Sequence, residues 1–311
     1  MLNNYLPEGS LYGTSENREY ISSLQGLERA RNEGKILEGV VTKCDSQTLD
    51  LHVDLYGIDG IIRREEAVFE DEIKDIAIIT RVGKPVAFKV IQITKDEAGK
   101  AYVVLSRREA QRDCVNNYIM DLIPGDIIPA KITHFEPFGA FLDIGCGVSS
   151  LLSIDSISVS RISSPGERFC LREELKVVVK SIDYENKRVN ASTKELFGTW
   201  EENASNFQTG QTVSGIIRSI ESYGIFVELA PNLAGLAELR EDAQIGQSCA
   251  VYIKSIIPEK MKIKLVIIDT YEAQSKKITR DDYYIDIDKE VHIDYWRYSP
   301  SESAKVMETI F

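Results

Sequence analysis

The chain has 311 residues, of which 43% are hydrophobic and 28% are charged, and this leaves room for two or three domains with apolar cores. It contains no run of about eighteen apolar residues and does not begin with a basic region followed by an apolar stretch, so we expect a cytoplasmic protein without a membrane span or a secretory signal. The five cysteines are far apart and are expected to stay reduced, and the net charge of −12 argues at first against a nucleic-acid partner.

The first expected element is a helix in an N-terminal arm that covers residues 1–33. Ile21, Leu24 and Leu27 have the spacing of one helical face within about residues 16–32. Gly34 then provides a C-terminal stop, because glycine readily adopts the left-handed conformation in which many helices end. The arm is therefore predicted to be helical.

Three later segments share one pattern, and we interpret them as repeats that cover residues 34–108, 123–194 and 210–268. Each begins with a strand-like alternation of apolar and polar residues, a turn, and a second alternation that ends in an acid. Each continues with a short apolar run, a strongly alternating strand and a final short strand. The pattern predicts five short strands in each repeat, with a loop between the third and the fourth.

A five-stranded antiparallel sheet of this size must protect its two open edges, and closing into a barrel does so. Five strands suit the OB type of barrel. We therefore predict a mostly β protein with three tandem five-stranded OB-fold barrels joined by short helices. A helical N-terminal arm and an extended C-terminal tail complete the expected architecture.

The two connectors between the repeats, residues 109–122 and 195–209, are expected to be helical. A serine stands three residues before a glutamate at the start of each, which is the spacing of an N-terminal capping box. The two pairs are Ser106 with Glu109 and Ser192 with Glu195.

The tail, residues 269–311, contains a strand-like stretch at 283–288, and we expect an extended arm that ends in a short helix. Trp296 and Tyr298 add an aromatic cluster. Such a cluster could be an aromatic platform for bases, in addition to any on the repeats. More often it docks a tail onto its own domain, and we favour the docking interpretation.

The distribution of charge removes the objection that the net charge raised. The three repeats together carry −1, so −11 of the net charge of −12 belongs to the arm, the connectors and the tail. Near-neutral repeats are compatible with a local basic groove, although they do not demonstrate one.

The second repeat resembles the S1 RNA-binding domain, the module named after ribosomal protein S1 of the bacterial small subunit. The resemblance rests on Gly125-Asp126, on the string Phe138-Gly139-Ala140-Phe141-Leu142-Asp143, on Asp183 and on residues 188–192 within the five-strand frame. The third repeat is similar through residues 223–228, Tyr-Gly-Ile-Phe-Val-Glu. The first repeat keeps the frame but has Leu49 and His52 at the aromatic places. The resemblance covers about two thirds of the chain, and it implies RNA binding in translation.

Exposed aromatic side chains on an OB-type sheet stack on bases of single-stranded RNA, and each stack contributes about 1–3 kcal/mol. The candidates are Phe138 and Phe141 in repeat two and Tyr223 and Phe226 in repeat three. Residues three apart point to opposite faces of a regular strand, so strict alternation would separate the two phenylalanines. The alternative is that both are core residues. Gly139 permits a turn or bulge that would bring both to the surface, and the resemblance favours this interpretation.

Three cations are candidates for contacts with phosphates or bases. Lys187 and Arg188 follow the turn at residues 184–186, and Lys262 stands in the place of Arg188 in repeat three. A solvated turn charge is the alternative. Asp183 is expected to orient neighbouring groups. A histidine that the family often has two residues after a Gly-Leu pair is replaced in all three repeats, by Arg63, Ser153 and Glu238.

We expect no catalysis, metal or cofactor. The three histidines, His52, His134 and His292, have no metal-ligand spacing, no two cysteines stand close together, and no phosphate-binding glycine loop is present. The sequence thus predicts a non-catalytic protein that binds single-stranded RNA or mRNA in translation at the small ribosomal subunit, with small-subunit proteins as candidate partners of repeat one. The alternatives are a protein-interaction scaffold and an accessory factor of RNA decay.

Overall fold

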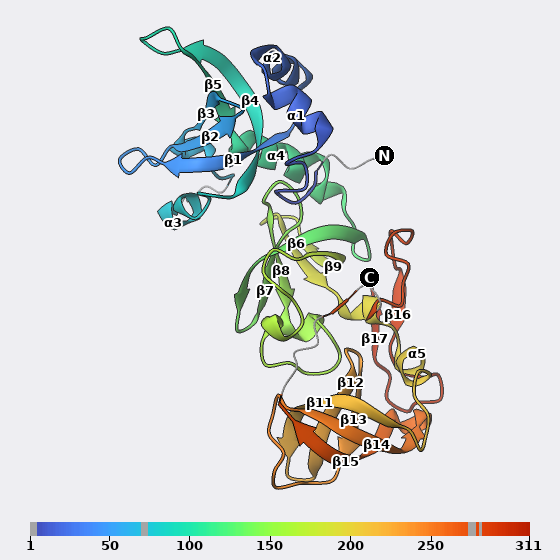
Figure 1. Ribbon diagram of the computed structural model, residues 1–311. Helices are drawn as coiled ribbons and strands as arrows, with labels where there is room; N and C mark the ends of the chain where they lie inside the picture. The colour runs from blue at the N-terminus through green and yellow to red at the C-terminus, as the bar shows by residue number, and fades with distance from the viewer. Residues whose placement is uncertain (1–4, 70–73, 273–277, 280–281) are drawn as a thin grey trace. The chain divides into compact units, whose positions relative to one another are not determined.

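The structure is a computed structural model that describes residues 5–69, 74–272, 278–279 and 282–311, so parts of the predicted arm and tail lie outside the described residues. It contains three closed five-stranded barrels, as predicted (Figure 1). The chain divides into two compact units. Unit 1 comprises Met1–Leu122 and Asp143–Ser149, and unit 2 comprises Ile123–Leu142 and Ser150–Phe311.

All three barrels share one topology. The first strand pairs with the second and the fourth, and the third pairs in parallel with the fifth. Barrel 1 contains β1 (Leu37–Cys44), β2 (Leu51–Leu55), β3 (Ile58–Ile62), β4 (Pro85–Lys95) and β5 (Ala101–Ser106). Barrel 2 contains β6 (Ile127–Glu136), β7 (Gly139–Asp143), β8 (Ser149–Ser153), β9 (Glu174–Asp183) and β10 (Arg188–Ser192). Barrel 3 contains β11 (Thr212–Glu221), β12 (Gly224–Ala230), β13 (Leu233–Ala237), β14 (Ser248–Ile257) and β15 (Lys262–Tyr271).

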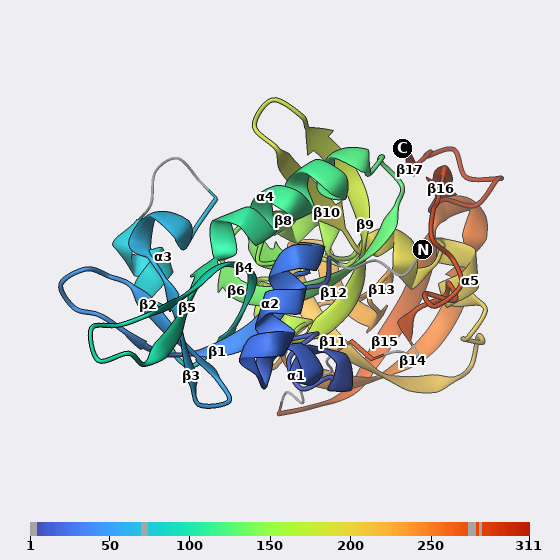
Figure 2. The same ribbon diagram turned by 90° about the horizontal axis from the view of Figure 1, so that it is seen from above.

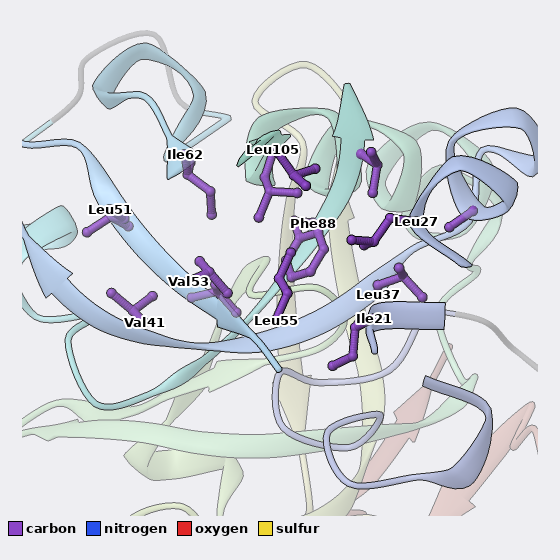
Figure 3. Close-up of a cluster of buried hydrophobic side chains, with 14 of the residues drawn as sticks. Ile21, Leu27, Leu37, Val41, Leu51, Val53, Leu55, Ile62, Phe88 and Leu105 are labelled. Carbon is purple, nitrogen blue, oxygen red and sulfur yellow. The ribbon is translucent and has the colours of Figure 1, made fainter. Parts of the chain in front are cut away.

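Each barrel encloses the apolar half of its alternating strands. In barrel 1, Val53 and Leu55 of β2 meet Phe88 of β4 and Leu105 of β5, and all four are fully buried (Figure 3). Ile21 and Leu27 of the arm extend the same core. Alternation with a period of two therefore places one side of every strand inside and leaves the other side for the surface.

The arm forms two helices, α1 (Ser15–Ile21) and α2 (Leu24–Glu33), so the prediction of one helix was wrong. The cause is Ser23, which has an extended backbone and whose hydroxyl caps α2 by accepting a hydrogen bond from the Gly26 amide at 3.0 Å. The break also leaves Leu24 exposed, whereas Ile21 and Leu27 are buried. Gly34 ends α2 in the left-handed conformation, as expected. Helix α2 packs against β4 (Figure 2).

The first connector is helical, as predicted. The helix α4 (Arg107–Asn117) begins at Ser106, whose hydroxyl accepts from the Glu109 amide at 2.9 Å. The second connector differs, because the helix expected at Ser192 is a short 3-10 turn, η5 (Lys194–Phe197). The α-helix α5 (Trp200–Ala204) begins after it, at a capping box formed by Thr199 and Glu202. The Ser192 hydroxyl instead lies within hydrogen-bond distance of the Glu195 carboxylate and of the Ser156 carbonyl.

The tail holds an antiparallel strand pair, β16 (Tyr295–Arg297) and β17 (Glu308–Ile310), where a short terminal helix was expected. Residues 283–288, expected to be strand-like, form turns and bends. Trp296 and Tyr298 are buried in the core of barrel 3, so the docking interpretation is correct. Within the described residues, no helix has the length and apolar character needed to cross a membrane.

Barrels 2 and 3 meet in unit 2 through a buried group of charged side chains. Arg168 of barrel 2 donates from both terminal nitrogens to the Glu228 carboxylate of β12, at 2.6 and 2.5 Å. Arg218 of β11 donates to the same carboxylate at 2.6 Å and also contacts Glu167. Arg168 is 1% exposed and Glu228 is 5% exposed, so water is excluded from this pair.

A second contact between these barrels uses the fully buried Asn232 of the loop before β13. Its Nδ2 donates to the carbonyls of Lys194 and Gly198, at 2.7 and 2.8 Å, and its Oδ1 accepts from the Val159 amide at 2.9 Å. The hydroxyl of Tyr298 in the tail donates to the Asn232 carbonyl at 2.6 Å. The tail and both barrels of unit 2 are thus joined by satisfied, buried hydrogen bonds.

Candidate nucleic-acid interface

The aromatic pair of barrel 2 lies at the surface. Phe138 belongs to the two-residue turn between β6 and β7 and is 54% exposed. Phe141 stands on β7 between the buried Ala140 and Leu142, so it points outward, and its ring lies 6.1 Å from that of Phe138 at an edge-to-face angle of 82°. The turn removes Phe138 from the strand alternation, which is why two aromatics three residues apart share one surface.

Gly139 makes this arrangement possible by allowing a close backbone approach. A Cβ atom at this position would lie 2.4 Å from the Leu152 carbonyl oxygen of the neighbouring strand β8. The Phe138 carbonyl also accepts from the Ile154 amide at 2.9 Å, which holds the turn against the end of β8. The glycine between the two aromatics is therefore a packing requirement of the barrel.

Barrel 3 repeats the geometry. Tyr223 lies in the turn between β11 and β12 and is 67% exposed, and Phe226 points outward between the buried Ile225 and Val227. The two rings are 6.1 Å apart at 89°. A Cβ atom on Gly224 would lie 2.6 Å from the Ala237 carbonyl oxygen, so this glycine has the same role as Gly139.

Barrel 1 has no such pair. His52 faces Lys43 across the hairpin as Phe226 faces Ser219 in barrel 3, so His52 occupies the strand position of the second aromatic. Its ring lies 3.2 Å from an oxygen of Asp59. The turn before β2 is longer than in the other barrels, and Leu49 lies in it with a φ of 60°. The frame is thus retained without an aromatic ring at the turn.

The three predicted cations are exposed. Lys187 and Arg188 lie at the turn between β9 and β10, and Arg188 faces Asp183 across the strand pair. The Asp183 carboxylate accepts from the Asn186 and Glu185 amides, at 3.0 and 3.1 Å, and these bonds, led by that of Asn186, lower its pKa. Asp183 therefore shapes the turn that presents the cations, as expected. Lys262 is exposed at the start of β15.

His134 of β6 is a member of the barrel 2 surface that the sequence pattern did not identify. Its ring stacks on Phe141 with centroids 4.5 Å apart and an interplanar angle of 8°. The neighbouring Thr133 hydroxyl donates to the Phe141 carbonyl at 3.0 Å. His134 could have been found only from the register of the hairpin, since nothing in its immediate sequence marks it.

Strand pairing defines an outer row of side chains across each barrel. The row begins at the second aromatic position and continues over the third, fifth and fourth strands. In barrel 1 it contains His52, Ile61, Val104 and Gln92. In barrel 2, Asn190 pairs with both Leu151 and Ser181, and Phe141 stands at the start of the row on β7, the neighbouring strand of β8. In barrel 3 it contains Phe226, Leu236, Lys264 and Ser255.

The family profile described as "S1 RNA binding domain" matches residues 31–108 and 121–194, which are the first two repeats. These two repeats belong to the S1 RNA-binding domain family. The third barrel has the same strand order as the two matched repeats, and it carries the same aromatic pair as the second.

Curated relatives with similar sequences are named as ribosomal proteins. The chain is 28% identical over 233 residues to "Small ribosomal subunit protein bS1 homolog" of Bacillus subtilis, which covers 73% of this chain and 58% of that protein. It is 27% identical over 257 residues to the bS1 of Staphylococcus aureus, and the match covers 78% of this chain and 63% of that protein. For the bS1 of Chlamydia muridarum the identity is 26% over 256 residues, and the match covers 78% of this chain and 44% of that protein. The chain thus matches only part of the length of each relative.

Proposed function

We propose that this protein binds single-stranded RNA or mRNA through the outer surfaces of barrels 2 and 3, without catalysis. The observation that carries the proposal is the exposed edge-to-face aromatic pair at the same place in both barrels. Bases stack on such rings with little regard to sequence. Phe138, Phe141, Tyr223 and Phe226 would form the stacking surface, and Lys187, Arg188 and Lys262 would contact the phosphates.

The names of the curated relatives support a role in translation at the small ribosomal subunit, and hence a place in the cytoplasm. Barrel 1 would have a different task. Because it lacks the aromatic pair, it would contribute little to RNA binding and would instead contact small-subunit proteins. In its Arg63-Arg64-Glu65-Glu66 run, the first three side chains are exposed and provide a charged surface for such a contact.

Titration of labelled single-stranded RNA tests the proposal. Phe138→Ala and Phe141→Ala are each expected to weaken binding by about 1–3 kcal/mol, the contribution of one stacked base. Tyr56→Ala is a matched control, because Tyr56 is also 54% exposed but lies on barrel 1, and it should change little. Equal losses in all three variants, or none in the phenylalanine variants, would contradict the proposal.

Cosedimentation with purified small ribosomal subunits tests the role in translation. We expect binding that persists when RNA contacts are weakened by Phe141→Ala, because barrel 1 would still contact ribosomal proteins. If the protein binds RNA but never sediments with the subunits, the ribosomal role is refuted while the proposed RNA binding stands.

A further inference from the structure

The outer rows of the three barrels differ in side-chain chemistry at one position, the third. The second residue is aliphatic in every row and the fourth is an uncharged polar residue. The third residue is Val104 in barrel 1, Asn190 in barrel 2 and Lys264 in barrel 3. We propose, resting on the RNA binding proposed above, that this residue sets what each barrel recognises. The Asn190 amide binds a base edge, the Lys264 ammonium group binds a phosphate, and Val104 binds neither.

The position of Lys264 suits a phosphate next to a stacked base. Its neighbours Ile263 and Leu265 are buried, so Lys264 points outward, and only Leu236 separates it from Phe226 in the row. Strands lie about 4.8 Å apart, so the two backbones are about 10 Å apart, and the long lysine side chain covers much of that span. The backbone of a nucleotide stacked on Phe226 would thus come within reach.

The charges around Lys264 support an anionic ligand. Lys254, Lys260 and Lys262 are also exposed in the β14–β15 region. Among the described residues, no acid forms an ion pair with any of these four lysines. A lysine ammonium group is a compact, strongly hydrated point charge that binds phosphate without base discrimination.

Asn190 offers a different chemistry at the same place. Its side chain is exposed, and its Nδ2 donates one hydrogen bond to the Ser181 hydroxyl at 3.1 Å. An amide has two N–H donors and a carbonyl acceptor, so one donor remains beside the acceptor. A donor beside an acceptor is the pattern by which an asparagine pairs with the edge of a base, and single-stranded RNA exposes those edges.

Exchanging the two residues in the full-length chain tests the phosphate contact. For single strands each phosphate contact contributes about 0.7 to the slope of log Kd against log salt concentration. Lys264→Asn should lower the slope by about 0.7 and Asn190→Lys should raise it by the same amount. Each shift changes the ratio of the Kd values at about 200 and 50 mM salt by about 2.6-fold. Lys305→Asn removes an exposed lysine of the tail as a control and should leave the slope unchanged.

Comparison of adenine, uracil and cytosine homopolymers tests the base contact. Asn190→Ala should reduce the spread of Kd values among them by about fivefold or more, because a good amide–base pair discriminates by about 1–3 kcal/mol. Lys264→Asn should leave that spread unchanged. Circular dichroism identifies variants that fail to fold, and Asn190→Ser and Lys264→Gln then replace them.

The possible outcomes distinguish failure of RNA binding from failure of the Asn190 and Lys264 contacts. A full-length protein that binds no single-stranded RNA overturns the proposed function itself. Two other outcomes overturn only the assignment of Lys264 and Asn190. In one, RNA binding is retained but the exchange variants have unchanged slopes, and in the other the unaltered protein binds RNA without base preference.

Discussion

Arg168 is one of the largest fully buried side chains in the described residues, and it forms an ion pair with Glu228. Breaking a buried ion pair by removing one partner leaves an uncompensated charge and typically costs about 3–5 kcal/mol. We expect Arg168→Ala to destabilise unit 2 toward the lower end of that range, because Arg218 still contacts Glu228. Chemical denaturation followed by tryptophan fluorescence measures the loss.

Arg240→Ala is the matched control for this experiment. Arg240 pairs with Asp242 on the surface, where the two side chains are 31% and 56% exposed. An ion pair of this kind contributes no more than about 1 kcal/mol. Similar losses in the two arginine variants would show that burial of the Arg168 pair does not determine its contribution.

His292 gives the docking of the tail a dependence on pH. Its ring nitrogens lie 2.8 Å from an Asp126 oxygen of barrel 2 and 3.2 Å from an Asp294 oxygen, and the hydrogen bond to Asp126 is the main cause of a raised pKa of His292. The protonated ring therefore favours the folded tail. This stabilisation is complete below the unfolded pKa of about 6.5 and disappears as the pH rises through the raised value.

We therefore expect His292→Gln to lower the melting temperature of the protein at pH 6 and to have a much smaller effect at pH 8.5. Thermal unfolding of both proteins at the two pH values provides the measurement. A difference that is independent of pH would mean that the ring acts through packing and not through its charge.

At the scale of elements, Gly139 allows β7 to approach β8 closely. Gly139→Ala would place a methyl group against the Leu152 carbonyl, and overpacking of this kind costs about 1–3 kcal/mol. Gly166→Ala is a control in the same barrel, because the nearest atom to its added Cβ would be 3.6 Å away. We expect a lower denaturation midpoint for Gly139→Ala alone, and equal midpoints for the two variants would contradict the packing argument.

The strands were predictable because a period of two must put one set of side chains inside a closed barrel. Helix ends were less predictable, since a capping serine can also serve other groups. Ser106 caps α4 as its spacing suggests, whereas Ser192 bonds the Ser156 carbonyl and leaves Thr199 to start α5. Local spacing identifies the residues that can cap, but the tertiary structure selects among them.

The candidate site was predictable only in part, for a related reason. The aromatic residues Phe138 and Phe141 stand close together in the chain, so a local string identifies them. His134, Asn190 and Lys264 reach the same surfaces through strand pairing, and the register of those pairs cannot be derived from any one of the strands.

At the scale of the whole molecule, the repeats differ in their expected contribution to RNA affinity. We predict that a fragment of about residues 123–311 retains most of the affinity and that a fragment of about residues 1–108 retains little, because only the former carries the aromatic pairs. Titration of both fragments with the same RNA, after circular dichroism has verified folding, measures the division. Comparable affinity of the N-terminal fragment would contradict it.

The buried contacts between barrels 2 and 3 affect how affinity depends on the length of an RNA strand. Two modules on a flexible linker gain from each other only as far as the linker maintains a high effective concentration. Barrels 2 and 3 share buried side chains and one tail, so a strand held by one barrel meets the other at a fixed separation. Affinity should therefore stay low for short oligonucleotides and rise in one sharp step at the length that first spans both barrels.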